Sequence, residues 1–540
     1  MKHKLLNSLF IILLLNSSFL FAQSTDLSYM VSGGKLNPLQ ANMDIRHYTL
    51  ALDVNPQQEA INGYVTIDLI LSQPTDTLLF DLVHLLKVAK IEVNGRNCSF
   101  SQSKDYIFIT GENKFRAGKQ SVKIEYGGKP PVAVKPPWDG GFSWKKDSNG
   151  NSWVAINCQL EGGKIYFPCK DHPSDEPNEG VDLFITVPKP LVVAGPGLLE
   201  SVKNKSKNEV TYHWKTNYTI SNYCIVFNIG KYKVVSRPFT TVDGNEVPMQ
   251  FYVLEEDIAF ADHVLDIRER DTKILEKYFG EYPWVKEKIG IAEVPNSGME
   301  HQTMITYGDK FKYRKVAGQD YSDNLLHEFG HEWFANKVTN KDWAHMWIQE
   351  GITTYSEALF FKEIAGESAY DSTMLKFRMR VQNKKPIVLG EEVNGTEAYS
   401  GDIYFKGAFF MHTLRFVLGD AIFFPTLKEL ATDKKYTYDN FVTTDDVEKL
   451  FSKNYGKDLK PLFDFYLRTI NKLEIQVTQS NSDEYLVSIT NLPIPLSIDI
   501  STDSGKQKAI FSDNKPVKIK SKTLPIIDAN GYYLKRVVFQ

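Results

Sequence analysis

The stretch HEFGH at residues 327–331 decides how the rest of this 540-residue sequence is interpreted. Apolar residues around it at helical spacing predict an α-helix. Residues four apart share one face of a helix, so the imidazoles of His327 and His331 can reach one metal ion. Glu328 stands beside the first histidine, where it can take a proton from a water near the metal. Alone, the pattern also fits two surface histidines on a helix.

A third candidate ligand makes a metal site the better interpretation. Glu350 lies in WIQEG (residues 347–351), and a second helical pattern follows it. We expect Glu350 in the first turn of that helix, where the helix dipole favours a carboxylate. Two imidazoles and one carboxylate leave a fourth position open, as a catalytic zinc requires. The sequence therefore predicts one Zn²⁺. Glu357, two turns on, is either an acceptor for a ligand histidine N–H or an exposed helical glutamate.

The spacing HExxH-x(18)-E resembles that of the gluzincin aminopeptidases of the aminopeptidase N type, peptidase family M1. HEWFANKVT (residues 331–339) is similar to their HQWFGNxVT stretch. Trp343 and residues 347–351 are similar to the WxxxWLNEG that follows. The departures fall on positions that are not ligands: Glu332, Ala335, Ile348 and Gln349. The resemblance implies a zinc-dependent aminopeptidase whose substrates are peptides with a free N-terminus.

SGMEH (residues 297–301) resembles the exopeptidase signature GxMEN, with Ser297 and His301 as departures. The resemblance implies that Glu300 binds the α-amine of the substrate and that Gly298 and Met299 belong to the same substrate site. A carboxylate held at a fixed distance from the metal admits a chain whose first amine lies next to the scissile bond. An internal peptide segment would leave that carboxylate buried without an ammonium partner, which is costly.

Two weaker motifs complete the candidate site. YFKG (residues 404–407) matches the family's YxKG, which implies that Tyr404 donates a hydrogen bond to the oxyanion. Without the zinc motif, a core tyrosine at a helix start would be the better interpretation. Tyr399 has a family counterpart that lines the pocket. Residues 158–159 and 168–171 resemble the leukotriene-hydrolase branch and imply Gln159 as a second partner for the substrate amine. A buried structural glutamine is the competing interpretation.

Outward from the motifs, the chain is predicted to be a multidomain α+β protein. Alternating patterns, for example at residues 47–54 and 64–70, predict an N-terminal all-β domain over residues 23–235, and the resemblance implies that it is the family's β saddle. Helical patterns dominate residues 236–470, and the resemblance implies that this part is a thermolysin-like α/β zinc metallopeptidase domain. Alternation returns in 471–540, which predicts a small C-terminal β-sandwich. The long helical fourth domain of many relatives is not expected. The site is therefore either more open or covered by another subunit.

The first residues have the order of a secretory signal peptide. Lys2 and Lys4 give a basic start, an apolar stretch follows to residue 21, and Ala22 is a small residue at the expected cleavage site. Polar residues interrupt the stretch too often for a membrane anchor, and no later run has the length of a membrane span. We expect removal of residues 1–22, export to a periplasm or the extracellular space, and no stable membrane insertion.

Composition excludes some functions and leaves others open. Lys and Arg total 63 against 66 Asp and Glu, so no basic field indicates nucleic acid. Cys98, Cys158, Cys169 and Cys224 either form one of three full pairings or are small buried hydrophobes.

Two alternative functions stay open. One is another hydrolase on the same zinc scaffold, either an endopeptidase or an epoxide hydrolase, and the other is a catalytically silent binding protein. First-residue preference, physiological substrate and oligomeric state are not readable from the sequence.

Overall fold

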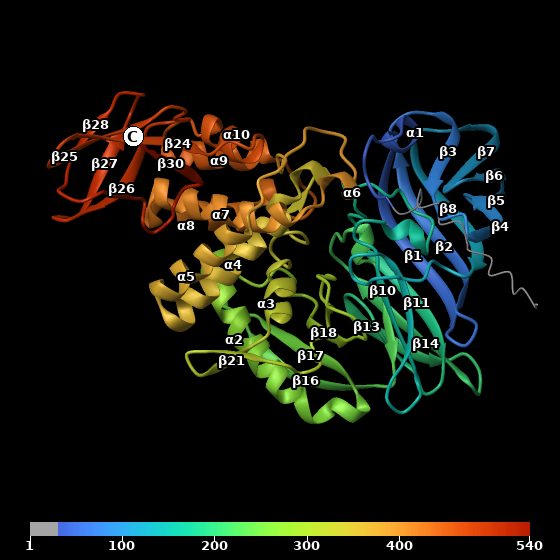
Figure 1. Cartoon of the computed structure of the whole chain (residues 1–540). Helices are drawn as coiled ribbons and strands as arrows, with labels where there is room; N and C mark the ends of the chain where they lie inside the picture. The colour runs from blue at the N-terminus through green and yellow to red at the C-terminus, as the bar shows by residue number, and fades with distance from the viewer. Residues whose placement is uncertain (1–30) are drawn as a thin grey trace, which may run out of the picture.

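The computed structural model describes residues 31–540, so the predicted signal peptide at residues 1–22 lies outside the described part of the chain. Three bodies follow one another (Figure 1): a β domain, a central domain of helices around a small sheet, and a second β domain at the C-terminus. The predicted fold class is confirmed in this order. Within the described residues, no helix is both long and apolar enough to cross a bilayer.

The β domain is built on an eight-stranded sheet whose strands alternate buried and exposed residues, as the sequence pattern predicts. Leu50 of one strand pairs with Val65 of the next, and both side chains are fully buried. The turn Asn94-Gly95 joins two of these strands through two residues of positive φ, which asparagine and glycine tolerate best. Across the sheet the strands are β13 (Leu198–Asn204), β14 (Glu209–Thr216), β11 (Val181–Pro188), β1 (Met43–Asn55), β2 (Ala60–Leu71), β8 (Gly118–Gly128), β4 (Leu86–Val93) and β5 (Arg96–Asn97).

Two smaller sheets complete this domain, and the short helix α1 (Pro38–Ala41) precedes its first strand. The loop that carries Gln159 follows strand β10 (Ser152–Asn157), which belongs to the four-stranded one of these two sheets. The three-stranded sheet contains β3 (Thr75–Asp81), β7 (Tyr106–Phe115) and β6 (Ser99–Ser103). The four-stranded sheet contains β12 (Val192–Ala194), β15 (Asn228–Gly230), β10 (Ser152–Asn157) and β9 (Gly141–Lys146).

The central domain begins with a mixed four-stranded sheet. Its first strand, β16, runs through residue 235, so the predicted boundary between the first two domains falls inside a strand of the second. The strands are β16 (Tyr232–Thr240), β17 (Glu246–Leu254), β18 (Ile289–Glu293) and β19 (Ile305–Tyr307). Two-stranded pairs follow: β20 (Arg314–Val316) with β21 (Gln319–Tyr321), and β22 (Thr339–Asn340) with β23 (Phe441–Val442).

Helices form the rest of the central domain. The HEFGH helix starts at Ser322, whose Oγ accepts a hydrogen bond from the Leu325 backbone N–H at 3.0 Å. It ends at Gly330, and His331 follows with helical backbone angles. The helices are α2 (Ala261–Phe279), α3 (Asp323–Gly330), α4 (Trp347–Ala365), α5 (Glu367–Arg380), α6 (Gly395–Ala398), α7 (Gly401–Leu418), α8 (Asp420–Thr432), α9 (Thr444–Tyr455) and α10 (Lys460–Leu467).

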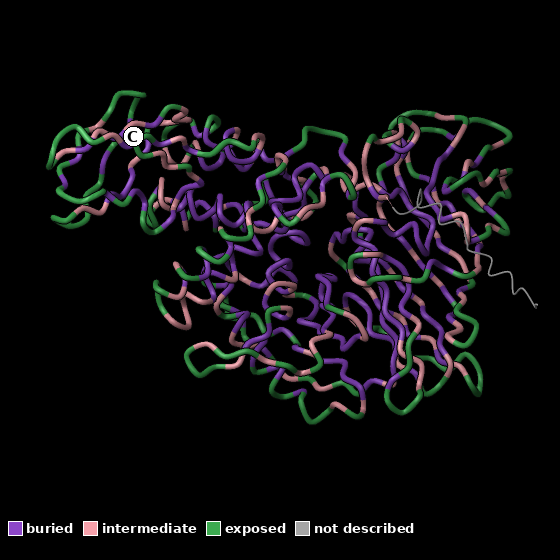
Figure 2. The backbone as a smooth tube through the Cα atoms, viewed as in Figure 1, coloured by how far each residue is buried: buried purple, intermediate pink, exposed green. Residues whose placement is uncertain are grey.

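Two glycines set how closely α4 and α7 cross. A Cβ atom on Gly351 of α4 would lie 2.8 Å from the Cα of Gly407 in α7, so neither position has room for a side chain. The first half of α4 is buried on all its faces, from Trp347 to Ser356. Figure 2 shows this buried backbone at the centre of the molecule. The crossing therefore fixes Glu350 and Tyr404 relative to each other from the two helices.

The C-terminal domain is a small sandwich of two sheets, and the chain ends in it, on the side of the molecule away from the first β domain (Figure 1). The strands predicted from residues 473–477 and 485–489 are both present. The larger sheet contains β28 (Val517–Lys520), β25 (Glu484–Ile489), β24 (Leu473–Asn481) and β30 (Lys535–Phe539). The smaller contains β27 (Gly505–Phe511), β26 (Leu496–Thr502) and β29 (Ile526–Ile527).

Candidate active site

A cleft of about 450 Å³ opens between the first β domain and the central domain. Both domains supply its walls, and nearly all of the predicted site residues line it. From the β domain come Pro137, Trp138, Gln159 and Leu160. From the central domain come Ser297, Gly298, Met299, Glu300, Asn324, His327, Glu328, His331, Glu350, Arg380, Tyr399, Gly401, Tyr404 and Phe405. Glu357 stands just behind this wall.

Three candidate metal ligands converge on one point. The Nε2 atoms of His327 and His331 lie 3.2 Å apart. The Glu350 Oε2 atom lies 3.6 Å from the first of these nitrogens and 3.3 Å from the second. Glu350 occupies the first turn of α4, as expected. These three residues form a group of donors close enough to hold one cation.

The surroundings of these donors fit a zinc ion. His327 Nδ1 lies 2.8 Å from Glu357 Oε1, and His331 Nδ1 lies 2.9 Å from the Phe334 carbonyl oxygen, so both rings turn Nε2 toward the common point. Burial alone would raise the pKa of Glu350, but the two histidines lower it to about 2. Its Oε2 is buried and accepts no hydrogen bond from any residue in 31–540, as a ligand atom awaiting a metal would.

Glu328 faces the cleft beside the metal donors. The Asn324 side-chain amide donates a hydrogen bond to Glu328 Oε1 at 3.0 Å, from one turn earlier on α3. Burial raises the pKa of Glu328 to about 7. A carboxyl group with such a pKa can both accept and return a proton near neutral pH.

Glu300 is held by donors from three distant parts of the chain. Its Oε1 accepts hydrogen bonds from Gln159 Nε2 at 2.5 Å, from the Tyr223 hydroxyl at 3.0 Å and from Gln349 Nε2 at 3.2 Å. Gln159 Nε2 also lies 3.2 Å from Oε1 of the metal ligand Glu350. Glu300 is almost fully buried, and burial raises its pKa. All of these donors are neutral, so the carboxylate is oriented but not neutralised.

The SGMEH segment is shaped by a close backbone contact. A Cβ atom on Gly298 would lie 2.2 Å from the Thr306 carbonyl oxygen, which explains a glycine there. The Met299 backbone N–H donates to Thr306 Oγ1 at 2.8 Å. His301, a departure from the family pattern, is buried, and neither ring nitrogen has a hydrogen-bond partner among the described residues. Burial lowers its pKa to about 3, so the ring is neutral.

Tyr404 and Tyr399 stand together on one side of the cleft. The Tyr404 hydroxyl donates to the Tyr399 hydroxyl at 3.2 Å, and its ring centre lies 5.9 Å from that of His327. Burial raises the pKa of Tyr404 well above its ordinary value, so the phenol keeps its proton. Tyr404 lies in the first turn of α7, next to the crossing with α4.

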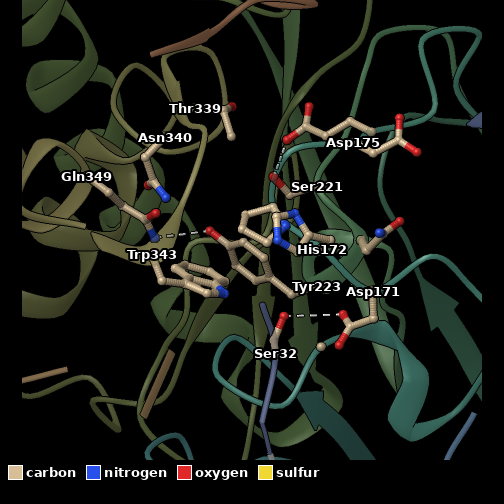
Figure 3. Close-up of a pocket in the computed structure, with 14 residues that line it drawn as sticks. Ser32, Asp171, His172, Asp175, Ser221, Tyr223, Thr339, Asn340, Trp343 and Gln349 are labelled. Atoms are coloured by element: carbon tan, nitrogen blue, oxygen red, sulfur yellow. Dashed lines mark hydrogen bonds between the residues drawn. The ribbon is translucent and has the colours of Figure 1, made fainter. Parts of the chain in front are cut away.

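A small cavity of about 20 Å³, with room for roughly one water, is lined in part by Tyr223 and Gln349, two of the donors to Glu300 (Figure 3). Gln349 donates to the Tyr223 hydroxyl at 3.2 Å along its wall. Two wall atoms, Asn340 Oδ1 and Trp343 Nε1, are buried and have no hydrogen-bond partner within residues 31–540. The cavity therefore leaves two polar wall atoms close to the supports of Glu300 without a partner among the described residues.

The sequence did not single out Tyr223, Gln349 or Asn324 as site residues. Asn324 had a local signal, because it precedes Glu328 by four residues and shares its helical face. Gln349 is a departure from the family motif beside a candidate ligand, and it contacts Glu300.

Ala335 is a departure from the family motif that affects the backbone. It stands where the family pattern has glycine, and its φ of +142° is a strained conformation for alanine.

The four cysteines form no disulfide, and the interpretation as small buried hydrophobes holds for three of them but not for the partly exposed Cys98. Cys158, Cys169 and Cys224 are fully buried, and burial raises the pKa of each thiol well above its ordinary value. These thiols are packing groups rather than nucleophiles.

Comparison with known families gives two matches along the chain. Residues 264–466 match the peptidase family M1 domain, and residues 45–224 match the peptidase M1 N-terminal domain. Together they cover well over half of the sequence. They include HEFGH, Glu350, Tyr404 and Glu300 in the first match and Gln159 in the second.

Individual relatives are distant. A leucyl aminopeptidase from Saccharolobus solfataricus is 24% identical over 441 residues, which are 77% of this chain and 52% of the relative. Aminopeptidase 2 from Candida albicans is 20% identical over 550 residues, 94% of this chain and 57% of the relative. The chain thus spans little more than half of the length of these curated relatives.

Solved structures share the fold. An M1 zinc metallopeptidase from Deinococcus radiodurans superposes with a TM-score of 0.65 and 23% identity, covering 79% of this chain and 93% of that one. A mutant of it, crystallised with a Tyr-Ser-Ala substrate, gives the same score and covers 94% of its own length.

Proposed function

Because the chain belongs to peptidase family M1, we propose that it is a zinc-dependent aminopeptidase that hydrolyses the bond after the first residue of a peptide. The observation that carries this proposal is the presence in one cleft of a three-donor metal group and a separate carboxylate, Glu300. The first supplies hydrolytic chemistry. The second supplies a reason for cleavage to begin at a free amine.

One Zn²⁺ would be held by His327, His331 and Glu350. When bound, it polarises the scissile carbonyl and makes a nearby water more acidic. Glu357 orients the ring of His327 through its hydrogen bond to Nδ1. The Phe334 carbonyl does the same for His331.

Glu328 acts as the proton carrier of the reaction. It accepts a proton from the attacking water and then delivers it to the leaving amine, which requires a group that can hold either state near neutral pH. The hydrogen bond from Asn324 restrains Glu328 Oε1 and leaves Oε2 available for this transfer. Tyr404 donates its phenolic hydrogen to the oxygen that becomes negative at the scissile carbon. Tyr399 accepts that hydrogen when no substrate is present.

Glu300 and Gln159 bind the substrate ammonium group. The three neutral donors orient Glu300 and include no cation, so a substrate ammonium group that reaches this carboxyl group gains a charge-assisted hydrogen bond. Because Gln159 also contacts Glu350, the amine site and the metal site share one side chain. The distance between amine and scissile bond is therefore set by the protein, which limits cleavage to one residue per event.

Mass spectrometry of a digested peptide tests this proposal. One unblocked peptide and its N-acetylated copy are incubated with the protein, with and without a metal chelator. We expect successive one-residue losses from the unblocked peptide only, and none with the chelator. Internal cuts would identify an endopeptidase instead. Absence of cleavage, with turnover of an epoxide substrate, would favour the other hydrolase on this scaffold. Binding of the peptide without any hydrolysis would favour a silent binding protein.

We also propose that the protein is exported to a periplasm or the extracellular space. The support is the basic, apolar and small-residue order of residues 1–22 in the sequence. N-terminal sequencing of protein from the periplasmic or culture fraction should begin at Gln23. Recovery of full-length protein from the cytoplasmic fraction would contradict export.

A further inference from the structure

A second groove adjoins the cleft at the catalytic centre. It has a volume of about 690 Å³ and shares six lining residues with the cleft. The shared residues are Asn324, His327, Glu328, Arg380, Tyr404 and Phe405. The groove contains neither Glu300 nor Gln159. A peptide whose amine lies at Glu300 and whose scissile bond lies at Glu328 would therefore extend its remaining residues into this groove.

The last turns of α5 place two cations on the wall of the groove. Lys376 and Arg380 are four residues apart on this helix, so they share one face, and both line the groove. Both side chains are exposed. Neither has an ion pair or hydrogen bond with any residue in 31–540. The Arg380 guanidinium instead lies 4.3 Å from the centre of the Phe405 ring, at the junction of groove and cleft.

The other charged groups of the groove already have partners. Arg314 lies 3.0 Å from Asp323, and Lys315 lies 3.3 Å from Asp320. Glu357 is bonded to His327, and Glu328 accepts from Asn324. The groove therefore presents an uncompensated positive pair to whatever occupies it. Like charges four apart on a helix repel each other, so a bound anion would relieve that repulsion as well as gain two contacts.

We propose that Lys376 and Arg380 bind a carboxylate of the substrate on the leaving side of the scissile bond. This inference rests on the aminopeptidase function proposed above. The guanidinium offers two parallel donors to a carboxylate, and the ammonium adds a second charge-assisted contact. The carboxylate comes either from the C-terminus of a short peptide or from an aspartate or glutamate side chain. The preferred substrates are thus short or acidic peptides. Their amine binds at Glu300, and one of their carboxylates binds at Lys376 and Arg380.

Steady-state kinetics with three matched peptide series tests the proposal. The first series has three to six residues and a free C-terminus, and the second is the same with a C-terminal amide. The third is amidated and carries one glutamate at a varied position after the first residue. We expect kcat/KM to be about tenfold higher for peptides with a carboxylate at the right distance, mostly through KM. The first and third series distinguish a terminal from a side-chain carboxylate.

Variants then assign the effect to the two cations. In K376Q/R380Q, the ratio of kcat/KM between carboxylate and amide peptides should fall to about one. R378Q is the control for each single variant, K376Q and R380Q: it removes one positive charge from the same helix at a residue that does not line the groove, and it should keep the tenfold ratio. The wild-type ratio should also shrink as salt rises, because the pair is exposed.

The outcomes separate the two proposals. Cleavage of amidated peptides without any preference for a carboxylate would overturn the role of Lys376 and Arg380 and leave the aminopeptidase function standing. A preference that survives in K376Q/R380Q would overturn it as well. Hydrolysis of no peptide in any series would overturn both proposals.

Discussion

Three glutamates in one cleft receive different roles from their neighbours. Glu350 faces two imidazoles, which hold it ionised as a metal ligand requires. Glu328 has one amide donor and a pKa raised to about 7 by burial, which suits a group that exchanges protons. Glu300 accepts hydrogen bonds from three neutral donors, so no cation among them competes with an incoming ammonium group. Identical side chains thus diverge in function because their environments differ.

The variant Glu328→Gln should retain zinc and lose turnover by about 10³-fold or more, because the amide cannot carry the proton. Metal analysis and kcat on an aminoacyl substrate measure the two quantities separately. Glu363→Gln is the matched control and should remain active. It replaces a carboxylate on α4 that contacts Lys277 and Tyr278, away from the cleft. Near-normal turnover by Glu328→Gln would contradict the assigned role.

Glu357 should influence metal affinity rather than the proton transfer. Its 2.8 Å contact with His327 Nδ1 orients the ring and makes Nε2 a stronger ligand for a metal ion. Glu357→Ala is therefore expected to weaken zinc binding by about 10–100-fold, as loss of such a partner does elsewhere. Competition with a chromogenic chelator gives the dissociation constant. An unchanged affinity would contradict the orienting role of Glu357.

At the scale of elements, the contact between α4 and α7 connects two motifs that are far apart in sequence. Gly351 follows the ligand Glu350, and Gly407 lies one turn after Tyr404. Because the two glycines touch, the phenol on one helix is placed against the ligand on the other. Periodicity in the sequence could predict each helix, including Glu350 in the first turn of α4. It could not predict this contact, which depends on the packing of two separate helices.

Gly407→Ala should therefore displace Tyr404 while the metal ligands stay in place. The added methyl would lie 2.8 Å from the Gly351 Cα, so one helix must shift. We expect kcat to fall by about 100-fold with zinc content unchanged.

A double-mutant cycle with Tyr404→Phe checks the cause of that loss. If Gly407→Ala acts through the phenol, it should cost little further activity in the Tyr404→Phe background. Full additivity of the two losses would show that the glycine acts by another route.

At the scale of the whole molecule, a zinc ion held by His327, His331 and Glu350 would connect α3 and the residue after it to α4. Without it, two imidazoles and a buried carboxylate oxygen lack their common partner. A ligand present at 100 times its dissociation constant stabilises the folded state by about 2.7 kcal/mol. Chelation should therefore lower the Tm by about 5–10 °C, and added zinc should restore it.

Differential scanning calorimetry with and without the chelator measures this shift. The variant His331→Ala should show no response to the chelator, since it has lost a ligand. A wild-type Tm that does not respond to chelation would argue against a metal at this position.

The candidate metal ligands and Glu300 could be singled out from the sequence because short motifs carry them, and the structure brings them into one cleft. The donors around Glu300 were predictable only in part. Gln159 had a weak motif, whereas Tyr223 and Gln349 had no signal of function in the sequence. Their contacts arise where the two domains meet, and side chains that converge from distant segments leave no local periodicity.

Gln159 has one further consequence. It belongs to the β domain, yet its amide reaches both Glu300 and Glu350 of the central domain. A chimera that exchanges the β domain with that of a relative would therefore inherit part of its substrate selection from the donor of that domain. A change in the angle between the β domain and the central domain would move Gln159 relative to Glu350. We expect it to affect the choice of the cleaved bond more than the rate of hydrolysis. The position of Gln159 at the interface therefore sets the spacing between the proposed amine site and the candidate metal site, and engineering of one domain should keep this contact.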